Sequence, residues 1–208
     1  MAASNDDGVL AAEETFFALR SAEVAPRLLG RILRHGPIAL EITEVEAYGG
    51  PEDSASHARF GRTARNAPMW GPPGRLYVYL CYGIHSMLNL VTDPDGRAGA
   101  VLLRAARVLG GAEIVRERRG PRGDLLGPGK VAAALGIDGS LSGRSLADCG
   151  IEIRPGSRSG AVRCGPRVGI DYARPRDRRR RWRFALDDRG CISSPRDDLV
   201  LWRPRPIR

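Results

Sequence analysis

Lysine is almost absent from this chain. Lys130 is its single lysine, although 33 basic residues outnumber 24 acidic ones and leave a formal net charge of +9. Mechanisms that need a lysine amine therefore have one candidate nucleophile, which makes a Schiff-base route unattractive. The arginine forks suit bidentate binding of phosphate oxygens, so the charge favours a polyanionic partner whose affinity falls as salt rises.

Paired cysteines and long apolar runs are also lacking. The four cysteines, at positions 81, 149, 164 and 191, form no Cys-x-x-Cys motif, so neither a zinc site nor a redox pair is indicated. No run approaches the roughly 18 apolar residues of a membrane span, and the first residues lack the apolar stretch of a secretory signal. We expect a monomeric cytoplasmic protein with reduced thiols and no metal, nucleoid-associated if bacterial.

The remaining composition is that of one globular unit. The 208 residues, 42% of them hydrophobic, suffice for a single domain over 13–208, while the polar residues 1–12 are expected to be flexible. Periodicity and turn residues predict alternating short helices and strands, and hence a mixed α/β (α+β) fold. Helices are expected at 13–20, 22–29, 111–119 and 130–135, and strands at 31–33, 39–48, 76–81, 84–91, 100–107, 151–154, 161–170 and 182–186.

The stretch ITEVEAYGGPEDSASH, residues 42–57, concentrates acidic and aromatic groups beside a glycine turn. Strand alternation places Ile42, Glu44, Glu46 and Tyr48 on one face. Burying two unpaired carboxylates would cost roughly several kcal/mol. That face is therefore either exposed to solvent or has a catalytic role such as activating a water molecule. Glu46 is the preferred base because it lies nearer Tyr48 and the turn, and Glu44 remains the alternative.

A second landmark is LYVYLCYGIHSMLNL, residues 76–90, which predicts a β-hairpin and holds three of the five tyrosines. Tyr77 and Tyr79 share a strand face, and Tyr77 suits a β-core. Tyr82 precedes Gly83 at the turn, where a deep core position is uncommon. An aromatic side chain at a hairpin tip can enter a base stack, which indicates a contact with nucleic acid.

Arginine is distributed over two irregular segments. HARFGRTARNAPMWGPPG, residues 57–74, mixes cations with flat apolar side chains, as a loop lying on nucleic acid would. The segment 171–184 is arginine-dense and is interpreted as an exposed loop of solvated charge. Arg104 closes an apolar strand and is either an edge cation or a site residue.

Six motifs together resemble the alkyladenine (3-methyladenine) DNA glycosylase family, which removes alkylated purines from DNA. They are EVEAYGGPEDSASH, RNAPMW, GRLYVYLCYGIHSMLN, GAVLLRA, GPGKVAAALGI and RVGI, and they span about residues 15–170. The resemblance implies a single domain with a curved, largely antiparallel β-sheet, surrounding helices and a protruding β-hairpin.

The resemblance also implies roles for individual residues. Glu46 would be the general base, with Arg104 as its partner. The pocket for the flipped base would be formed by Tyr48, His57, Tyr79 and Asn89. Tyr82 would fill the gap left in the duplex, and the DNA-facing surface would include Arg65, Met69 and Lys130. The segment 187–195 matches the family only loosely, and its Ile192 carbonyl is our expected water-positioning group.

The sequence thus predicts a monofunctional DNA glycosylase of base excision repair. It would flip an alkylated purine out of double-stranded DNA and hydrolyse the N-glycosidic bond with a Glu-activated water, leaving an abasic site without metal or cofactor. One alternative is a non-catalytic binding module for damaged or structured nucleic acid. Another is a hydrolase of small nucleosides, which would share the pocket but hardly need Tyr82.

Overall fold

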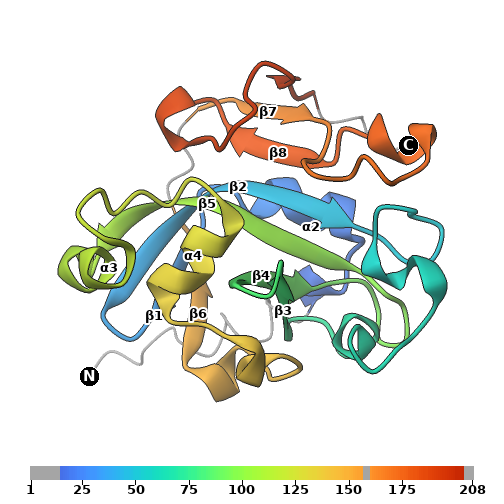
Figure 1. The fold of residues 1–208 in the computed structure, drawn as a ribbon, viewed down its shortest axis with the longest axis horizontal. Helices are drawn as coiled ribbons and strands as arrows, with labels where there is room; N and C mark the ends of the chain where they lie inside the picture. The colour runs from blue at the N-terminus through green and yellow to red at the C-terminus, as the bar shows by residue number, and fades with distance from the viewer. Residues whose placement is uncertain (1–14, 157–159, 204–208) are drawn as a thin grey trace, which may run out of the picture.

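A computed structural model describes residues 15–156 and 160–203, so the expected flexible segment 1–12 lies outside the described residues. Nine strands form one open antiparallel sheet with the order β3-β4-β5-β2-β8-β7-β9, and β1 joins β2 to β6 (Figure 1). The strands are β1 (Ile32–His35), β2 (Ile38–Tyr48), β3 (Leu76–Cys81), β4 (His85–Val91), β5 (Ala100–Gly110), β6 (Ile151–Arg154), β7 (Val162–Gly165), β8 (Arg183–Leu186) and β9 (Val200–Leu201). The predicted fold class is confirmed.

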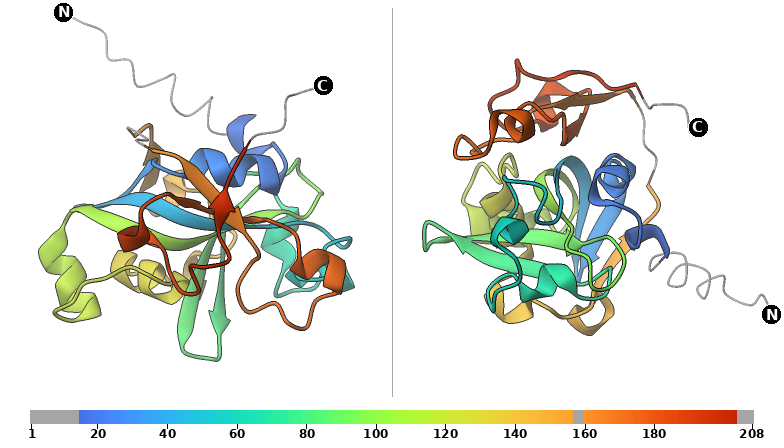
Figure 2. Two further views of the ribbon diagram at one scale, coloured as in Figure 1. Left: turned by 90° about the horizontal axis from the view of Figure 1, so that it is seen from above. Right: turned by 90° about the vertical axis from the view of Figure 1, so that its right-hand side faces the viewer.

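The helices pack on both sides of the long strands β2 and β5. They are α2 (Ser21–Leu28), α3 (Ala112–Arg119), α4 (Pro128–Leu135) and the short α5 (Pro175–Arg178). Seen from above, α2 lies on one side of these strands and α3 and α4 on the other (Figure 2). Val24, Leu28, Val131 and Leu135 are fully buried in the main apolar cluster, so the helices clamp the sheet from two directions. No helix within the described residues is long and apolar enough to cross a membrane.

Strand β2 is irregular where it carries the two carboxylates. Its register against β5 shifts on either side of Glu44, which marks a β-bulge. Ile42 and Val45 therefore both lie in the main apolar cluster, although regular alternation would place residues three positions apart on opposite faces. The prediction that Ile42 lies on the same face as Glu44 and Glu46 is wrong, because a bulge changes the face that every later residue occupies.

The predicted hairpin is present, and it protrudes from the body of the molecule (Figure 2). Strands β3 and β4 pair from Leu76 with Leu90 to Cys81 with His85. At the tip, Tyr82 and Gly83 have φ of 52° and 72°. Positive φ at both central residues is typical of type I′ turns, whose twist matches that of the flanking strands. The tyrosine side chain is consequently carried at the far end of the hairpin.

The C-terminal strands β7 and β8 form a ribbon over β2 (Figure 1). The expected strand 161–170 ends at Gly165, and Pro166 opens an irregular segment, residues 166–172, which we call the strap. The interpretation of 171–184 as a solvated loop is wrong in part, because Asp177 and Arg183 are fully buried. Both buried charges have partners from the N-terminal half, since Ser54 donates to Asp177 and Arg183 donates to Glu44.

Candidate active site

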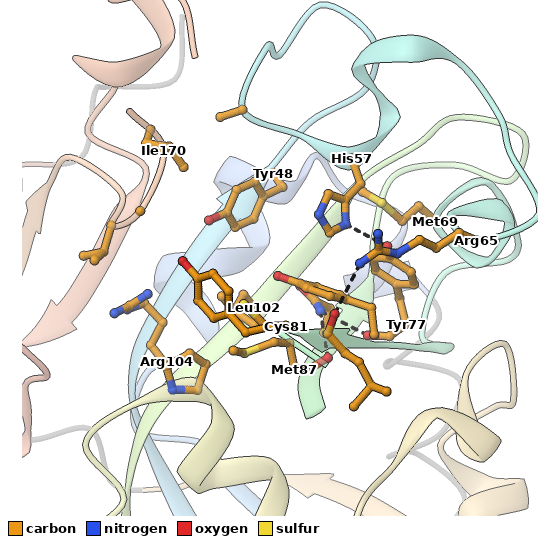
Figure 3. A pocket seen from close by; sticks show the side chains of 18 of the residues that line it. Tyr48, His57, Arg65, Met69, Tyr77, Cys81, Met87, Leu102, Arg104 and Ile170 are labelled. Carbon is orange, nitrogen blue, oxygen red and sulfur yellow. Dashed lines mark hydrogen bonds between the residues drawn. The ribbon is translucent and has the colours of Figure 1, made fainter. Parts of the chain in front are cut away.

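A cavity of about 380 Å³ opens between the β3–β4 hairpin, the loop after β2 and the strap (Figure 3). Its lining combines residues of β2, β3, β4 and β5 with residues from the segment 55–69 and from the strap. The curvature of the sheet brings these segments together although they are distant in sequence. Four of the predicted pocket residues, Tyr48, His57, Tyr79 and Asn89, line this one cavity.

The walls of the cavity are largely aromatic. His57 packs edge-on against Tyr79 with ring centroids 4.5 Å apart, and Tyr77 lies 5.5 Å from Tyr79 in a tilted arrangement. Burial raises the pKa of Tyr77 to about 12 and that of Tyr79 further, so both phenols stay neutral. Tyr77 was interpreted as a core residue. It is buried, but it also lines the cavity and accounts for the position of His57.

His57 is held in its neutral form. Its Nδ1 lies 2.8 Å from the hydroxyl of Tyr77. Burial lowers the pKa of His57 to about 4, and the positive charges of Arg65 and Arg59 act in the same direction. The imidazole is therefore uncharged at neutral pH and does not repel a cation in the cavity.

Glu46 lies directly behind the cavity wall. Its side chain is fully buried and is not part of the lining surface. Oε2 accepts a hydrogen bond of 2.8 Å from the hydroxyl of Tyr48, and Oε1 accepts one of 2.8 Å from the amide of Val168. Arg104 Nη1 approaches Oε1 at 3.4 Å. Since all three of these neighbours line the cavity, the carboxylate is one side chain removed from its interior.

Tyr48 is the wall residue in closest contact with this carboxylate. Burial raises the pKa of its phenol well above the ordinary value, and the charge of Glu46 adds to the effect. The hydroxyl therefore stays protonated and donates to Glu46, and the ring forms one aromatic face of the cavity (Figure 3).

Glu44, the alternative base, accepts hydrogen bonds from four donors. Its Oε1 accepts from Arg183 at 2.6 Å, from Ser193 Oγ at 3.0 Å and from Arg104 at 3.2 Å. Its Oε2 accepts from the amide of Ser193 at 2.6 Å. A carboxylate engaged by four donors has less room to accept a hydrogen bond from a water, so the geometry favours Glu46.

Arg104 links the two carboxylates. Arg104 lies within β5 at the register shift opposite Glu44. The bulge there places its side chain on the same side of the sheet as the two glutamates. Burial lowers the pKa of Arg104, but the charges of Glu46 and Glu44 outweigh this and leave it raised. Of the two possibilities left open for Arg104, the structure selects a site residue over an edge cation, because it lines the cavity and pairs with Glu46.

Asn89 presents an acceptor to the cavity. Its amide nitrogen donates to the carbonyls of Tyr77 at 3.0 Å and Met87 at 3.2 Å. Because both partners are acceptors, the orientation of the amide is fixed, and its carbonyl oxygen is the group left for a ligand.

Ile192, whose carbonyl is the expected water-positioning group, does not line the cavity. Its side chain is buried in a separate apolar cluster, and its carbonyl accepts from Arg196 Nε at 2.9 Å. The backbone that contacts Glu46 belongs instead to Val168 in the strap. Val168 belongs to the RVGI motif, and the water-positioning role of the Ile192 carbonyl stays a prediction.

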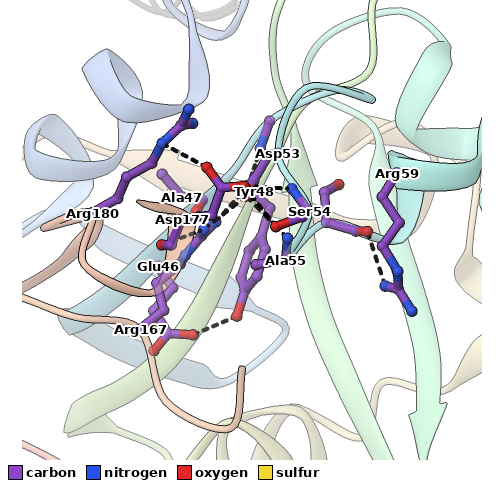
Figure 4. Close-up of polar contacts among 12 residues, drawn as sticks. Glu46, Ala47, Tyr48, Asp53, Ser54, Ala55, Arg59, Arg167, Asp177 and Arg180 are labelled. Carbon is purple, nitrogen blue, oxygen red and sulfur yellow. Dashed lines mark hydrogen bonds and ion pairs between the residues drawn. The ribbon is translucent and has the colours of Figure 1, made fainter. Parts of the chain in front are cut away.

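The strap is fixed by a buried ion pair (Figure 4). Arg167 donates to Asp53 at 2.6 and 2.8 Å and to the carbonyl of Ala47 at 2.8 Å. Its guanidinium lies 4.7 Å from the ring centre of Tyr48 and 5.2 Å from that of Trp182. Asp53 also accepts from the amide of Gly49, so it caps the turn while serving as the anchor of the strap. The neighbouring Val168 is thereby held against Glu46.

The family model for methylpurine-DNA glycosylases matches residues 15–190, which is most of the chain. The chain belongs to the methylpurine-DNA glycosylase family. A protein of Nitrosococcus oceani provisionally named 3-methyladenine DNA glycosylase is 50% identical over 86% of this chain and 90% of its own length. The DNA-3-methyladenine glycosylase of Arabidopsis thaliana is 48% identical over 88% of this chain and 74% of its own.

Membership of this family makes the chain a DNA-repair enzyme that hydrolyses an N-glycosyl bond, with DNA as its substrate. The resemblance found in the six sequence motifs is confirmed. No group of three or more histidine, cysteine, aspartate or glutamate side chains within the described residues could hold a metal ion.

In this glycosylase, the residues expected at the DNA-facing surface occupy different depths. Tyr82 is 92% exposed at the hairpin tip, and Arg65 is exposed beside it, donating to the carbonyl of Leu80. Lys130 is half-exposed and paired with Asp124 at the start of α4. Met69, expected on or near that surface, is only 2% exposed and lines the cavity from the 3-10 turn Ala67–Trp70, so its contact with DNA stays a prediction.

Proposed function

We propose that this glycosylase is monofunctional, flips an alkylated purine from duplex DNA into the aromatic cavity, and hydrolyses the N-glycosidic bond with a water activated by Glu46. The single observation that carries the proposal is the position of this carboxylate, buried behind a wall made by Tyr48, Arg104 and Val168. The products would be a free base and an abasic site.

The hydrogen bonding of Glu46 suits this role. Each carboxylate oxygen has two lone pairs, and Oε2 accepts only from Tyr48 among the contacts of the described residues. A water seated at the seam between Tyr48 and Arg104 could use the remaining lone pair while facing the sugar of a base in the cavity. Glu46 would then take the proton of the water and offset the positive charge that develops on the sugar.

The walls of the cavity support a cationic, electron-poor base as substrate. Aromatic faces attract such a base by cation–π interaction, and the neutral His57 adds no opposing charge. A positively charged alkylated purine is already a good leaving group, so no strong general acid is required. The volume of about 380 Å³ also falls within the roughly 300–1,000 Å³ of small-molecule sites.

The surface around the cavity supports duplex DNA as the form in which the base is presented. Tyr82 would fill the space left by the flipped nucleotide, while Arg65 and Lys130 would contact the backbone. The carbonyl oxygen of Asn89 would accept a hydrogen bond from the edge of the base and so contribute to selectivity. We further propose that the enzyme acts as a monomer in the cytoplasm, at the nucleoid if the cell is bacterial, and without metal or cofactor.

Glu46→Gln tests the mechanism. The amide oxygen can accept from the Val168 amide and the amide nitrogen can donate to the Tyr48 hydroxyl. The fold should therefore survive while single-turnover release of 3-methyladenine or 7-methylguanine falls at least roughly 10²-fold. Affinity for duplex with an abasic-site analogue should stay intact or rise. Glu113→Gln, at an exposed position of α3, is the matched control and should retain full activity. Undiminished release by Glu46→Gln would reject the mechanism.

Two further measurements separate the alternatives. A nucleoside hydrolase would process the free methylated nucleoside as fast as the damaged duplex, whereas the proposal requires strong preference for the duplex. Borohydride should trap no covalent enzyme–DNA adduct, because the nucleophile is water. An adduct at Lys130 would contradict the water mechanism.

A further inference from the structure

Exposed apolar side chains gather around the mouth of the cavity. Eight large hydrophobic residues are exposed in the described part of the chain, and three of them, Leu80, Tyr82 and Tyr172, line the cavity itself. Ile84 adjoins Tyr82 in the hairpin turn. The fifth, Phe60, is 81% exposed and belongs to a different segment, the 3-10 turn His57–Phe60, whose first residue is a wall of the cavity.

Phe60 is one layer of a three-part stack. The guanidinium of Arg59 lies 4.6 Å from the ring centre of Phe60 and 4.7 Å from that of Tyr172. Arg59 also donates to the carbonyl of Ser56, and the hydroxyl of Tyr172 donates to the carbonyl of Ala55. The stack therefore stands on the rim of the cavity, anchored to the same backbone that carries His57. Single exposed apolar side chains are common on protein surfaces and need no explanation. Phe60 differs because it belongs to a cluster of exposed apolar side chains beside a cavity and packs on the guanidinium of Arg59.

The loop that carries Phe60 is locked before any ligand arrives. Asn66 is buried, and its amide nitrogen donates to the carbonyls of His57 and Gly61, both at 2.9 Å. Its side-chain oxygen accepts from the amide of Thr63 at 2.7 Å. Gly61 has φ of 85°, which ends the turn directly after Phe60. The ring is thus presented by a preorganised loop, which lowers the entropic cost of a contact.

We propose that the free face of Phe60 forms a second contact with the DNA duplex, packing on the sugar or base edge of a nucleotide that flanks the flipped one. This contact rests on the proposed function, because the occupant is the strand whose base enters the cavity. Charge complementarity supports the occupant: Arg59, Arg62 and Arg65 lie on the same loop, and the chain carries a net charge of +9. Tyr82 then holds the duplex from the hairpin and Phe60 from the His57–Asn66 loop.

Phe60→Ala tests the contact, with Leu109→Ala, an exposed leucine at the end of β5, as the matched control. Affinity for a duplex with an abasic-site analogue is measured by fluorescence anisotropy. We expect Phe60→Ala to weaken binding at least 5-fold, consistent with the loss of about 1 kcal/mol of stacking. The single-turnover rate at saturating enzyme should stay near that of the parent, and Leu109→Ala should change neither quantity. Equal affinities of Phe60→Ala and the parent would overturn the proposal.

A photo-crosslinking residue gives a direct readout. Benzoylphenylalanine placed at position 60 should crosslink to nucleotides within two positions of the abasic analogue, and the same residue at position 109 should not. Crosslinks scattered along the duplex, or a Phe60→Ala defect confined to self-association in sedimentation, would show that the ring serves another contact. These readouts do not depend on excision, so a parent chain that binds through Phe60 but releases no base would reject the proposed function and leave the contact standing.

Discussion

At the scale of residues, the two carboxylates of β2 illustrate how neighbours two positions apart can take different tasks. Glu44 and Glu46 share the guanidinium of Arg104. Glu44 also satisfies the fully buried Arg183. Glu44, with four hydrogen-bond donors, therefore holds the cluster together, and Glu46, which accepts from Tyr48 and Val168, is the carboxylate that the proposed mechanism uses.

This division predicts different consequences for substitution. Glu44→Gln leaves Arg183 without its charged partner, so we expect the free energy of unfolding to fall by about 3–5 kcal/mol. Glu46→Gln keeps its neutral hydrogen bonds and should lose clearly less stability. Urea unfolding of both variants checks the order. Equal destabilisation would show that Glu46, too, is chiefly structural.

His57 gives the protein a pH dependence with a defined sign. Its pKa is about 4 when folded against an ordinary value of 6.5. As pH falls below about 6.5 the unfolded chain takes up the proton first, so the free energy of unfolding should decrease between pH 6.5 and 4. His57→Asn removes this component, and the variant should lose less stability than the parent between pH 7 and pH 4.5 in urea unfolding. Parallel losses would contradict the buried, neutral imidazole.

At the scale of elements, the β3–β4 hairpin combines an unfavourable backbone with an exposed aromatic ring. A tyrosine with φ of 52° costs the fold roughly 1 kcal/mol, and a ring 92% exposed recovers nothing from burial. Such a combination is understandable when the residue is kept for a partner.

Tyr82→Gly separates the two effects. Glycine adopts this conformation freely, so thermal or urea unfolding should show stability unchanged or raised by up to about 1 kcal/mol. Affinity for the damaged duplex should nevertheless fall, by about 1–3 kcal/mol if stacking is lost. Tyr82→Phe, which keeps the ring, should bind as the parent does. A glycine variant with undiminished affinity would show that the hairpin tip stays outside the duplex.

At the scale of the whole molecule, the arginine-rich surface should make binding strongly dependent on salt. Each phosphate contact contributes a slope of about −0.9 to the plot of log association constant against log salt. Arg62→Ala, at an exposed position of the His57–Asn66 loop, should reduce that slope by about 1 for damaged and undamaged duplex alike. An unaltered slope would place Arg62 away from the phosphates.

Several strands and the β3–β4 hairpin could be predicted because the patterns that specify them lie within short stretches of sequence. The β3–β4 hairpin follows from alternation and a turn glycine, and β6 begins and ends where the apolar pattern does. The four pocket residues came from the family resemblance of the motifs that contain them, and they line one cavity. These features depend on neighbours in the sequence, which is the information that a single chain provides.

What escaped prediction depends on distant partners. The bulge near Glu44 is set by pairing with β5, and alternation alone cannot reveal it. Asp177 and Arg183 looked like solvated charge because Ser54 and Glu44, their partners, lie more than 100 positions away. Val168 rather than Ile192 contacts Glu46 for the same reason.

Residues that contact Glu44 and Glu46 lie near the C-terminal end of the described chain and are therefore translated after β2. Residues 167–193 supply the anchor of the strap and three donors to Glu44, and they follow strands β1 to β7 in the chain. A ribosome that has translated only as far as β6 holds a chain whose acidic groups on β2 have not met these donors. The contact of Glu46 with Val168 and those of Glu44 with Arg183 and Ser193 can therefore form only after residues 168–193 have been translated.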